Sequence, residues 1–117
     1  QSGKKYSISR YRFKSCDSNE EEKNHYLTIV HSLATSLENV GTQVWSGAFL
    51  LADYILSNKH IFTNKTALEL GAGPGISGIV LSMFAKRCFL TDHSPEVLEI
   101  LSRNVEANRH LFTFDRY

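Results

Sequence analysis

Hydrophobic and polar positions change their period several times along the chain, and each change predicts an element. Residues 66–70 form a short apolar run that stops at a glycine cluster. Residues 76–85 are then apolar in a helical pattern, which Lys86 and Arg87 close with positive charge. A second short apolar run occupies residues 88–92. This order predicts a strand, a tight turn, a helix and a second strand.

The helix that follows has the clearest start signal in the chain. Ser94 offers a capping hydroxyl, Pro95 suits the first helical position, and Glu96 places a negative charge in the first turn. Apolar residues then recur at helical spacing to about Asn108. Strand-helix-strand-helix order predicts a parallel sheet with helical crossovers.

The first 24 residues are polar, and they include an acidic run at residues 20–22. We therefore expect a solvated N-terminal arm over residues 1–24 and a folded unit over residues 25–117. Residues 6–13 alternate, which allows a short edge strand. Basic residues interleaved with aromatics in this arm would also suit RNA, but a surface strand is the favoured interpretation.

Two more elements are predicted between the arm and the glycine cluster. Residues 26–30 are rich in β-branched side chains, which indicates a strand that runs to residue 32. A loop is expected from there to Gly41. Residues 44–57 are apolar on nearly every face, which is typical of a helix buried against other elements.

Composition narrows the class of protein. With 117 residues against about 150 for a typical domain, the chain is one domain or a piece of one. A hydrophobic share of 42% with only 2 prolines describes a chain that buries a core rather than a disordered or fibrous one. The formal net charge is +1, so bulk charge gives no argument for a nucleic acid or an anionic membrane as partner.

Metal, disulfide and membrane signals are weak. Cys16 and Cys88 lie far apart, and the histidines have no cysteine at ligand spacing, so we expect no zinc site and no disulfide framework. The longest charge-free stretch, residues 70–85, is too short to span a bilayer. The chain begins Gln1-Ser2-Gly3 without an initiator methionine or an apolar signal segment, so we expect a processed fragment of a cytoplasmic or nuclear protein.

The candidate chemistry lies in the glycine cluster, residues 71–75, between a predicted strand and a predicted helix. Glycines there permit positive φ angles and let a ligand approach bare backbone. Asp92 follows 21 residues after Gly71, at the end of the next strand, where a carboxylate accepts ribose hydroxyl protons. The combination predicts a bound nucleoside.

The glycine spacing alone leaves the identity of that nucleoside open. Residues 73–78 also satisfy the G-x-G-x-x-G spacing of dinucleotide folds, which would suit a nicotinamide-dependent oxidoreductase. Glu69, on the strand just before the loop, would repel a pyrophosphate but attract an amino group or a sulfonium. We therefore expect a cationic ligand group, with the dinucleotide as the alternative.

These residues carry a resemblance. Residues 68–75 (Leu-Glu-Leu-Gly-Ala-Gly-Pro-Gly) look like the first motif of the seven-β-strand methyltransferases. Residues 44–48 (Val-Trp-Ser-Gly-Ala) resemble the tryptophan-bearing helix of their protein-lysine branch. Residues 31–55 are similar to the branch called methyltransferase-like protein 22, as are the later positions Asp92, Arg103, Asn104 and Asn108. The likeness covers about residues 26–110.

The resemblance implies S-adenosylmethionine as cofactor, with Gly71, Ala72 and Gly73 around its methionine moiety. It also implies Asp92 on the ribose and Trp45 in the lining of the cofactor pocket, where an aromatic face attracts a sulfonium-bearing ligand. We add three neighbours to the expected cofactor-binding set: Glu69, Gly75 and His93. We expect His93 at the cofactor rim or facing solvent rather than acting as a base.

The resemblance also implies a Rossmann-like, doubly wound α/β sheet, of which the chain holds roughly half. The expected function is protein-lysine N-methylation, with a lysine-bearing protein as partner and with neither membrane nor nucleic-acid binding. No residue is named catalytic, since the fourth-strand motif that faces the substrate in the family is absent. A non-catalytic interaction fragment remains a second alternative, and residues 66–70 should leave an unpaired apolar edge.

Overall fold

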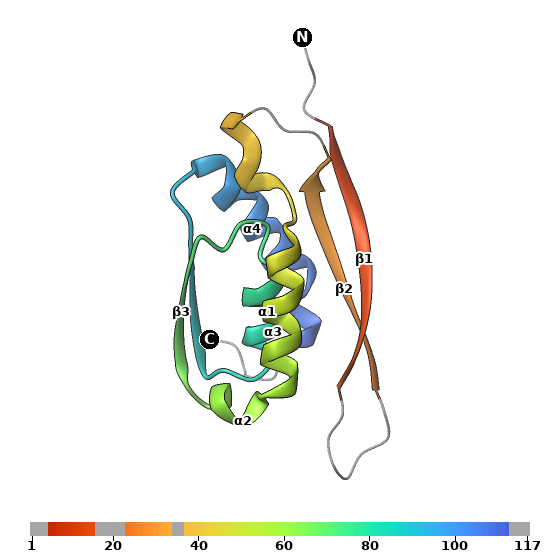
Figure 1. Cartoon of the computed structure of the whole chain (residues 1–117), viewed down its shortest axis with the longest axis vertical. Helices are drawn as coiled ribbons and strands as arrows, with labels where there is room; N and C mark the ends of the chain where they lie inside the picture. Colours follow the sequence, from red (N-terminus) through yellow and green to blue (C-terminus); the bar gives the residue numbers. More distant parts are fainter. Residues whose placement is uncertain (1–4, 16–22, 34–36, 113–117) are drawn as a thin grey trace.

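The computed structural model describes residues 5–15, 23–33 and 37–112. Its elements form three layers, with a long hairpin on one side, helices in the middle and a short parallel pair of strands on the other side (Figure 1). The elements run β1 Tyr6–Ser15, β2 Lys23–Ser32, the 3-10 helix η1 Leu37–Thr42, α1 Ser46–Ser57, α2 Lys59–Phe62, β3 Thr66–Leu70, α3 Ile76–Ser82, β4 Arg87–Thr91, α4 Pro95–Ala107 and the 3-10 helix η2 Arg109–Leu111.

The hairpin pairs β1 with β2 antiparallel, from Tyr6 opposite Ser32 to Ser15 opposite Lys23. The strand predicted from residue 26 to residue 32 is confirmed and begins earlier, at Lys23, and the alternating stretch at residues 6–13 also forms a strand. Alternation directs Leu27 and Ile29 into the core. The domain boundary at residue 24 stays a prediction, and the acidic run at residues 20–22 and Cys16 lie outside the described residues.

The second half of the chain follows the predicted order. Strands β3 and β4 pair in parallel, with Leu68 opposite Phe89, and α3 connects them. The helix α4 spans the predicted residues, but the Ser94 hydroxyl makes no capping hydrogen bond. Just before the helix, Asp92 Oδ1 accepts hydrogen bonds from the backbone N–H groups of His93 and Ser94 at 2.8 and 3.5 Å.

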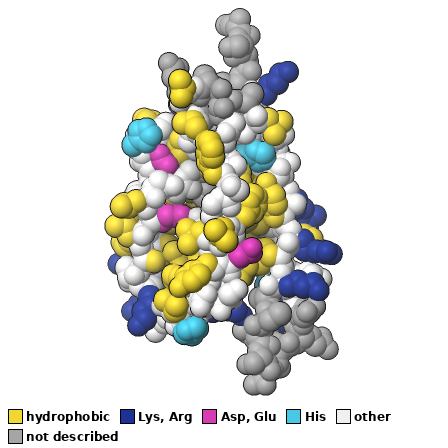
Figure 2. Space-filling model, in the orientation of Figure 1, with side chains coloured by type: hydrophobic (Ala, Val, Ile, Leu, Met, Phe, Trp, Pro, Cys, Tyr) yellow, Lys and Arg dark blue, Asp and Glu magenta, His cyan; other side chains and the backbone are white. Residues whose placement is uncertain are grey.

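The helix α1 is much less buried than its apolar pattern predicted. Only Ala52 and Ile55 are buried, whereas Leu50 is 74% exposed. The expectation of a buried helix is wrong for the described residues, because α3 covers one side of α1 and the opposite side faces outward. Figure 2 shows hydrophobic side chains over much of the face on which α1 lies.

The loop expected up to Gly41 also differs, since residues 37–42 form η1. A Cβ on Gly41 would lie only 2.9 Å from Cγ2 of Val97, and Thr42 is fully buried, so packing against α4 holds this segment. Leu111 ends η2, and residues 113–114 lie outside the described part of the chain.

Two asparagines, Asn104 in α4 and Asn108 directly after its end, pair with the open edge of β2. Asn104 and Asn108 are both buried and lie four positions apart in the sequence. The side-chain amide of each one bonds to the backbone N–H and C=O of one residue of β2. Asn104 accepts from Val30 N–H at 2.8 Å and donates to Val30 C=O at 2.9 Å, and Asn108 does the same for Thr28 at 2.9 and 2.7 Å. The side chains therefore stand in for a neighbouring strand.

Within the described ranges, no helix is both long and apolar enough to cross a membrane. The same residues contain no group of three or more histidine, cysteine, aspartate or glutamate side chains that would hold a metal ion.

Candidate functional site

The loop between β3 and α3 has a backbone that requires glycine. Gly71, Gly73 and Gly75 have φ angles of 68°, 55° and 102°. A Cβ on Gly75 would also lie 2.5 Å from Cδ1 of Leu101. The loop is tied to the sheet by Ala72, whose N–H donates to the Thr91 carbonyl of β4 at 2.9 Å. The glycine cluster is therefore a tight turn at the ends of both parallel strands, in which Gly71 is exposed and Gly75 is buried.

Glu69 places a carboxylate beneath this loop. Its Oε1 accepts a hydrogen bond from the Ser77 hydroxyl of α3, while its buried Oε2 has no hydrogen-bond partner among the described residues. Burial raises the pKa of the Glu69 carboxyl above its ordinary value, and the hydrogen bond from Ser77 partly opposes that rise. A Cβ on Gly78 would lie 2.5 Å from Oε2, so this glycine makes room for the carboxylate.

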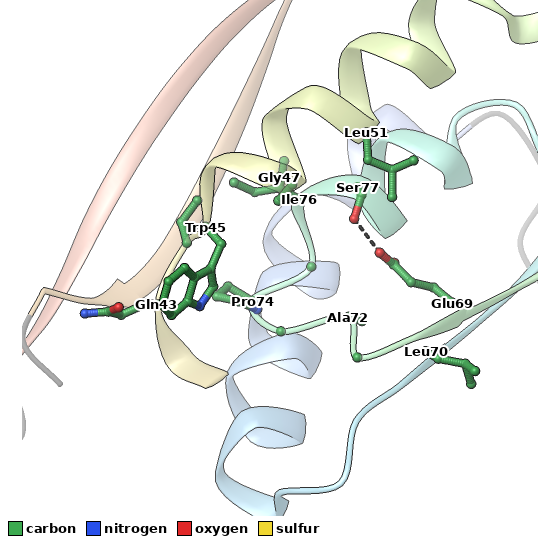
Figure 3. A pocket seen from close by; sticks show the side chains of 15 residues that line it. Gln43, Trp45, Gly47, Leu51, Glu69, Leu70, Ala72, Pro74, Ile76 and Ser77 are labelled. Carbon is green, nitrogen blue, oxygen red and sulfur yellow. Dashed lines mark hydrogen bonds between the residues drawn. The ribbon is translucent and has the colours of Figure 1, made fainter. Parts of the chain in front are cut away.

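A pocket of about 230 Å³ opens between the loop and the start of α1 (Figure 3). Trp45 immediately precedes α1, and its Nε1 donates to the Val40 carbonyl at 3.2 Å, which fixes the indole beside the loop. Glu69 and Ser77 lie on the opposite side of the loop from Trp45. The pocket therefore joins an aromatic face, bare backbone and one carboxylate.

Asp92 supports the loop from behind. Its side chain is only 7% exposed, and its Oδ2 accepts a hydrogen bond from the Gly73 N–H at 3.1 Å. The ring of His93 lies 3.2 Å from Asp92 Oδ1 and is otherwise in solvent, with 96% of the side chain exposed. Neither Asp92 nor His93 lines the pocket.

The structure thus brings together six of the eight cofactor-binding residues predicted from the sequence: Trp45, Glu69, Gly71, Ala72, Gly73 and Gly75. It adds lining residues that the sequence did not single out, among them Gln43, Leu51 and Ser77. Of these three, Ser77 could have been predicted from the sequence. It lies in the first turn of the predicted helix, where its hydroxyl can bond to a residue of the preceding strand. Gln43 carried no signal.

Asn104 is a further contributor that the site prediction missed. Besides its bonds to Val30, its amide donates to the Pro74 carbonyl in the glycine loop at 2.8 Å. One buried side chain therefore connects the hairpin, α4 and the loop.

An α/β arrangement with a glycine turn after the first parallel strand and an acid at the end of the second is typical of doubly wound α/β folds. The sequence pattern of the family described as lysine methyltransferase matches residues 21–115, and the chain belongs to that family. The resemblance seen in the sequence is thereby confirmed, as is the α/β fold class.

Individual relatives agree with the family. The chain is 47% identical over 85 residues to methyltransferase-like protein 22 of Homo sapiens, covering 73% of this chain and 21% of that protein. EEF1A lysine methyltransferase 3 of Xenopus tropicalis is 37% identical over 93 residues, covering 74% of this chain and 41% of that protein. Protein-lysine N-methyltransferase EEF2KMT of Homo sapiens is 35% identical over 86 residues, covering 69% and 26%. The chain thus spans about a fifth of the length of the first of these relatives.

Proposed function

We propose that this chain is the cofactor-binding part of an S-adenosylmethionine-dependent protein-lysine N-methyltransferase. The observation that carries the proposal is the Glu69 carboxylate, which keeps one buried oxygen without a partner among the described residues. Leaving such an oxygen unpaired is costly, and a cationic ligand group in the pocket that Glu69 lines would be attracted to this carboxylate. The pyrophosphate of a dinucleotide would meet like charge at the same place.

The pocket fits part of that cofactor. Its volume of about 230 Å³ is below the roughly 300–1,000 Å³ typical of sites for whole drug-sized ligands, so we assign it the methionine portion. Gly71, Ala72 and Gly73 would approach that portion through bare backbone. Trp45 would offer an aromatic face to the positive charge, a contact worth about 0.5–2 kcal/mol.

Asp92 would serve both the loop and the ribose. A carboxylate has about four acceptor positions, and the hydrogen bonds to Gly73 and to the start of α4 leave part of that capacity. Its remaining lone pairs would accept ribose hydroxyl protons at the edge of the loop. His93 would lie at the outer rim of the cofactor site.

The cofactor would supply a methyl group on a sulfonium. That methyl group would pass to a neutral lysine amine in a displacement in which the C–N bond would form as the C–S bond broke, with the bonding electrons left on sulfur and the proton given up by the amine. No described residue is assigned to that proton. The proposed partner is a protein that presents a lysine, as the names of the relatives suggest. A cytoplasmic or nuclear location is part of the same proposal.

Calorimetric titration of S-adenosylmethionine into this chain tests the proposal, with reduced nicotinamide dinucleotide as the competing ligand. We expect saturable binding of the sulfonium cofactor alone. Glu69→Gln should weaken it at least tenfold, which corresponds to about 1.4 kcal/mol of lost charge attraction. Asp92→Ala should weaken it as well, through the ribose and the loop.

Asp53→Asn is the matched control, because it makes the same acid-to-amide change on the exposed side of α1, outside the pocket lining. Its affinity should equal that of the unaltered chain. Preference for the dinucleotide, or an equal loss in Glu69→Gln and Asp53→Asn, would overturn the proposal. If neither ligand binds, this chain has no cofactor site.

A further inference from the structure

A second groove, of about 510 Å³, lies along β2 where the pairing with α4 ends. Asn104 pairs with Val30 and Asn108 with Thr28, so the next steps along the same edge are Tyr26 and Asn24. At that point α4 has ended at Ala107. The groove is lined by Arg10, Asn24, His25, Tyr26, His110, Leu111 and Phe112.

The edge of β2 in this groove presents backbone N–H and C=O groups for hydrogen bonding. Backbone N–H and C=O groups of a strand alternate between its two edges, and Thr28 and Val30 direct theirs toward α4. By the same alternation, Asn24 and Tyr26 direct theirs into the groove. No described residue pairs with that edge beyond Thr28. An extended segment can add to such an edge through main-chain hydrogen bonds.

The groove also carries the positive charge of one lining residue, Arg10. Arg10 crosses from β1, and its guanidinium carbon lies 4.3 Å from the centre of the Tyr26 ring. Burial lowers the pKa of His25, and the nearby charges of Lys23, Lys59 and His110 lower it further, so the neutral form of His25 is favoured and Arg10 supplies the charge of the groove. None of the seven lining residues is acidic. A ligand with negative charge is therefore favoured.

We propose that this groove docks an extended acidic segment of a partner protein, which adds as a short strand beside Asn24–Tyr26 with a carboxylate at Arg10. Main-chain pairing supplies affinity, and the planar guanidinium selects a carboxylate through two parallel N–H donors. Leu111 and Phe112 form an apolar wall for the alternate side chains. This surface is separate from the glycine pocket, and the proposal does not depend on methyl transfer.

A peptide fits this groove better than a nucleic acid does. A strand edge offers N–H donors and C=O acceptors in alternation, and a peptide backbone matches both. A phosphodiester backbone offers acceptors only, so the strand carbonyls would face phosphate oxygens. The net charge of +1 also gives little attraction for a polyanion.

The test titrates three fluorescent hexamers into the full 117-residue chain and follows anisotropy. One is a blocked peptide that alternates valine with glutamate, the second alternates valine with lysine, and the third is a single-stranded hexauridylate. We expect saturable binding of the glutamate peptide, at least tenfold tighter than either other probe. The amide resonances of Asn24 and Tyr26 should shift in its presence.

Arg10→Gln should weaken the glutamate peptide about tenfold, and Arg10→Lys should weaken it less, because charge is kept and the planar fork is lost. Arg12→Gln is the matched control, since it removes the same charge from the same strand outside the groove. It should change the affinity less than twofold. Far-UV circular dichroism of each variant verifies that the hairpin is intact.

Four results would overturn the proposal. They are no saturation by the glutamate peptide, equal binding of the lysine peptide, equal losses in Arg10→Gln and Arg12→Gln, and tighter binding of hexauridylate. The last would assign the groove to nucleic acid.

Discussion

At the scale of single residues, the backbone of the glycine loop is more demanding than its small side chains suggest. Gly75→Ala would put a methyl group 2.5 Å from Cδ1 of Leu101 at a φ angle of 102°. Backbone strain and overpacking each cost about 1–3 kcal/mol, so we expect the free energy of unfolding to fall by about 3 kcal/mol. Urea unfolding followed by circular dichroism measures it.

Gly47→Ala is the control for that substitution. Gly47 lines the same pocket, but it lies in the first turn of α1, and an added Cβ would meet nothing within 4 Å. Alanine should leave stability unchanged or raise it by up to about 1 kcal/mol. Equal losses in both variants would contradict the assignment of strain to Gly75.

Glu69 should make stability depend on pH in the direction opposite to that of most carboxylates. Its folded-state pKa is raised by burial, so the folded chain holds the proton more tightly than the unfolded chain does. The contribution of Glu69 to the free energy of unfolding is therefore fully present below the unfolded glutamate pKa of about 4.3. It is lost as the pH rises through the folded-state pKa of Glu69. Glu69→Gln should remove this loss.

Thermal unfolding of the two proteins across this pH range measures the effect. Above a pH of about 4.3, the melting temperature of Glu69→Gln should rise relative to that of the unaltered chain. The difference between the two melting temperatures should become constant once Glu69 is ionised in the folded state. A difference that stays constant with pH would show that Glu69 ionises normally.

At the scale of elements, the link between α4 and the hairpin depends on side-chain amides rather than on apolar contact alone. Asn104→Leu would leave three backbone groups without their partner: Val30 N–H, Val30 C=O and Pro74 C=O. Each buried unpaired group costs about 1–3 kcal/mol, so we expect stability to fall by about 3 kcal/mol or more. Amide hydrogen exchange at Val30 should become faster.

Ser102→Ala, on the exposed side of the same helix, should change stability by less than about 0.5 kcal/mol. Exchange at Thr28, which Asn108 holds, should change less than exchange at Val30. Were Val30 and Thr28 to exchange equally faster in Asn104→Leu, the loss would be general unfolding rather than loss of this pairing.

The elements also divide into those that local sequence could predict and those that it could not. The unit β3, loop, α3, β4 and α4 was predictable because glycines, a helix-start signal and periodic apolar residues all act within a few residues of each other. The segment η1 was not, since Gly41 is held against Val97, which is distant in sequence. The exposure of α1 was missed for the same reason, because an apolar pattern does not say which neighbours are present.

The candidate site was predictable to a similar extent. Trp45, Glu69 and the loop glycines were identified because each has a motif or a charge with a chemical meaning. The bracing role of Asn104 was not, since it depends on β2 meeting α4 across 74 positions of sequence. The hydrogen bond that Asp92 accepts from the Gly73 N–H of the loop could likewise not be predicted from the sequence.

At the scale of the whole molecule, the layers leave one face of the parallel pair uncovered. Helices lie against the face that carries Ala67 and Glu69, whereas Leu68 and Leu70 on the other face are 63% and 77% exposed. Phe89, opposite Leu68 on β4, is exposed beside them. Unpaired strand edges with apolar faces promote association between copies.

We therefore expect this 117-residue chain to self-associate in solution, and Leu70→Lys to reduce that association. Removing an apolar side chain and adding charge at the strand both disfavour edge pairing. Thr66→Lys adds the same charge to the same strand without removing apolar surface, so it should reduce association less. Sedimentation velocity over a range of concentrations measures the populations. A monodisperse monomer with a sharp cooperative unfolding transition would refute this expectation, because the exposed apolar face would then be stable in water by itself.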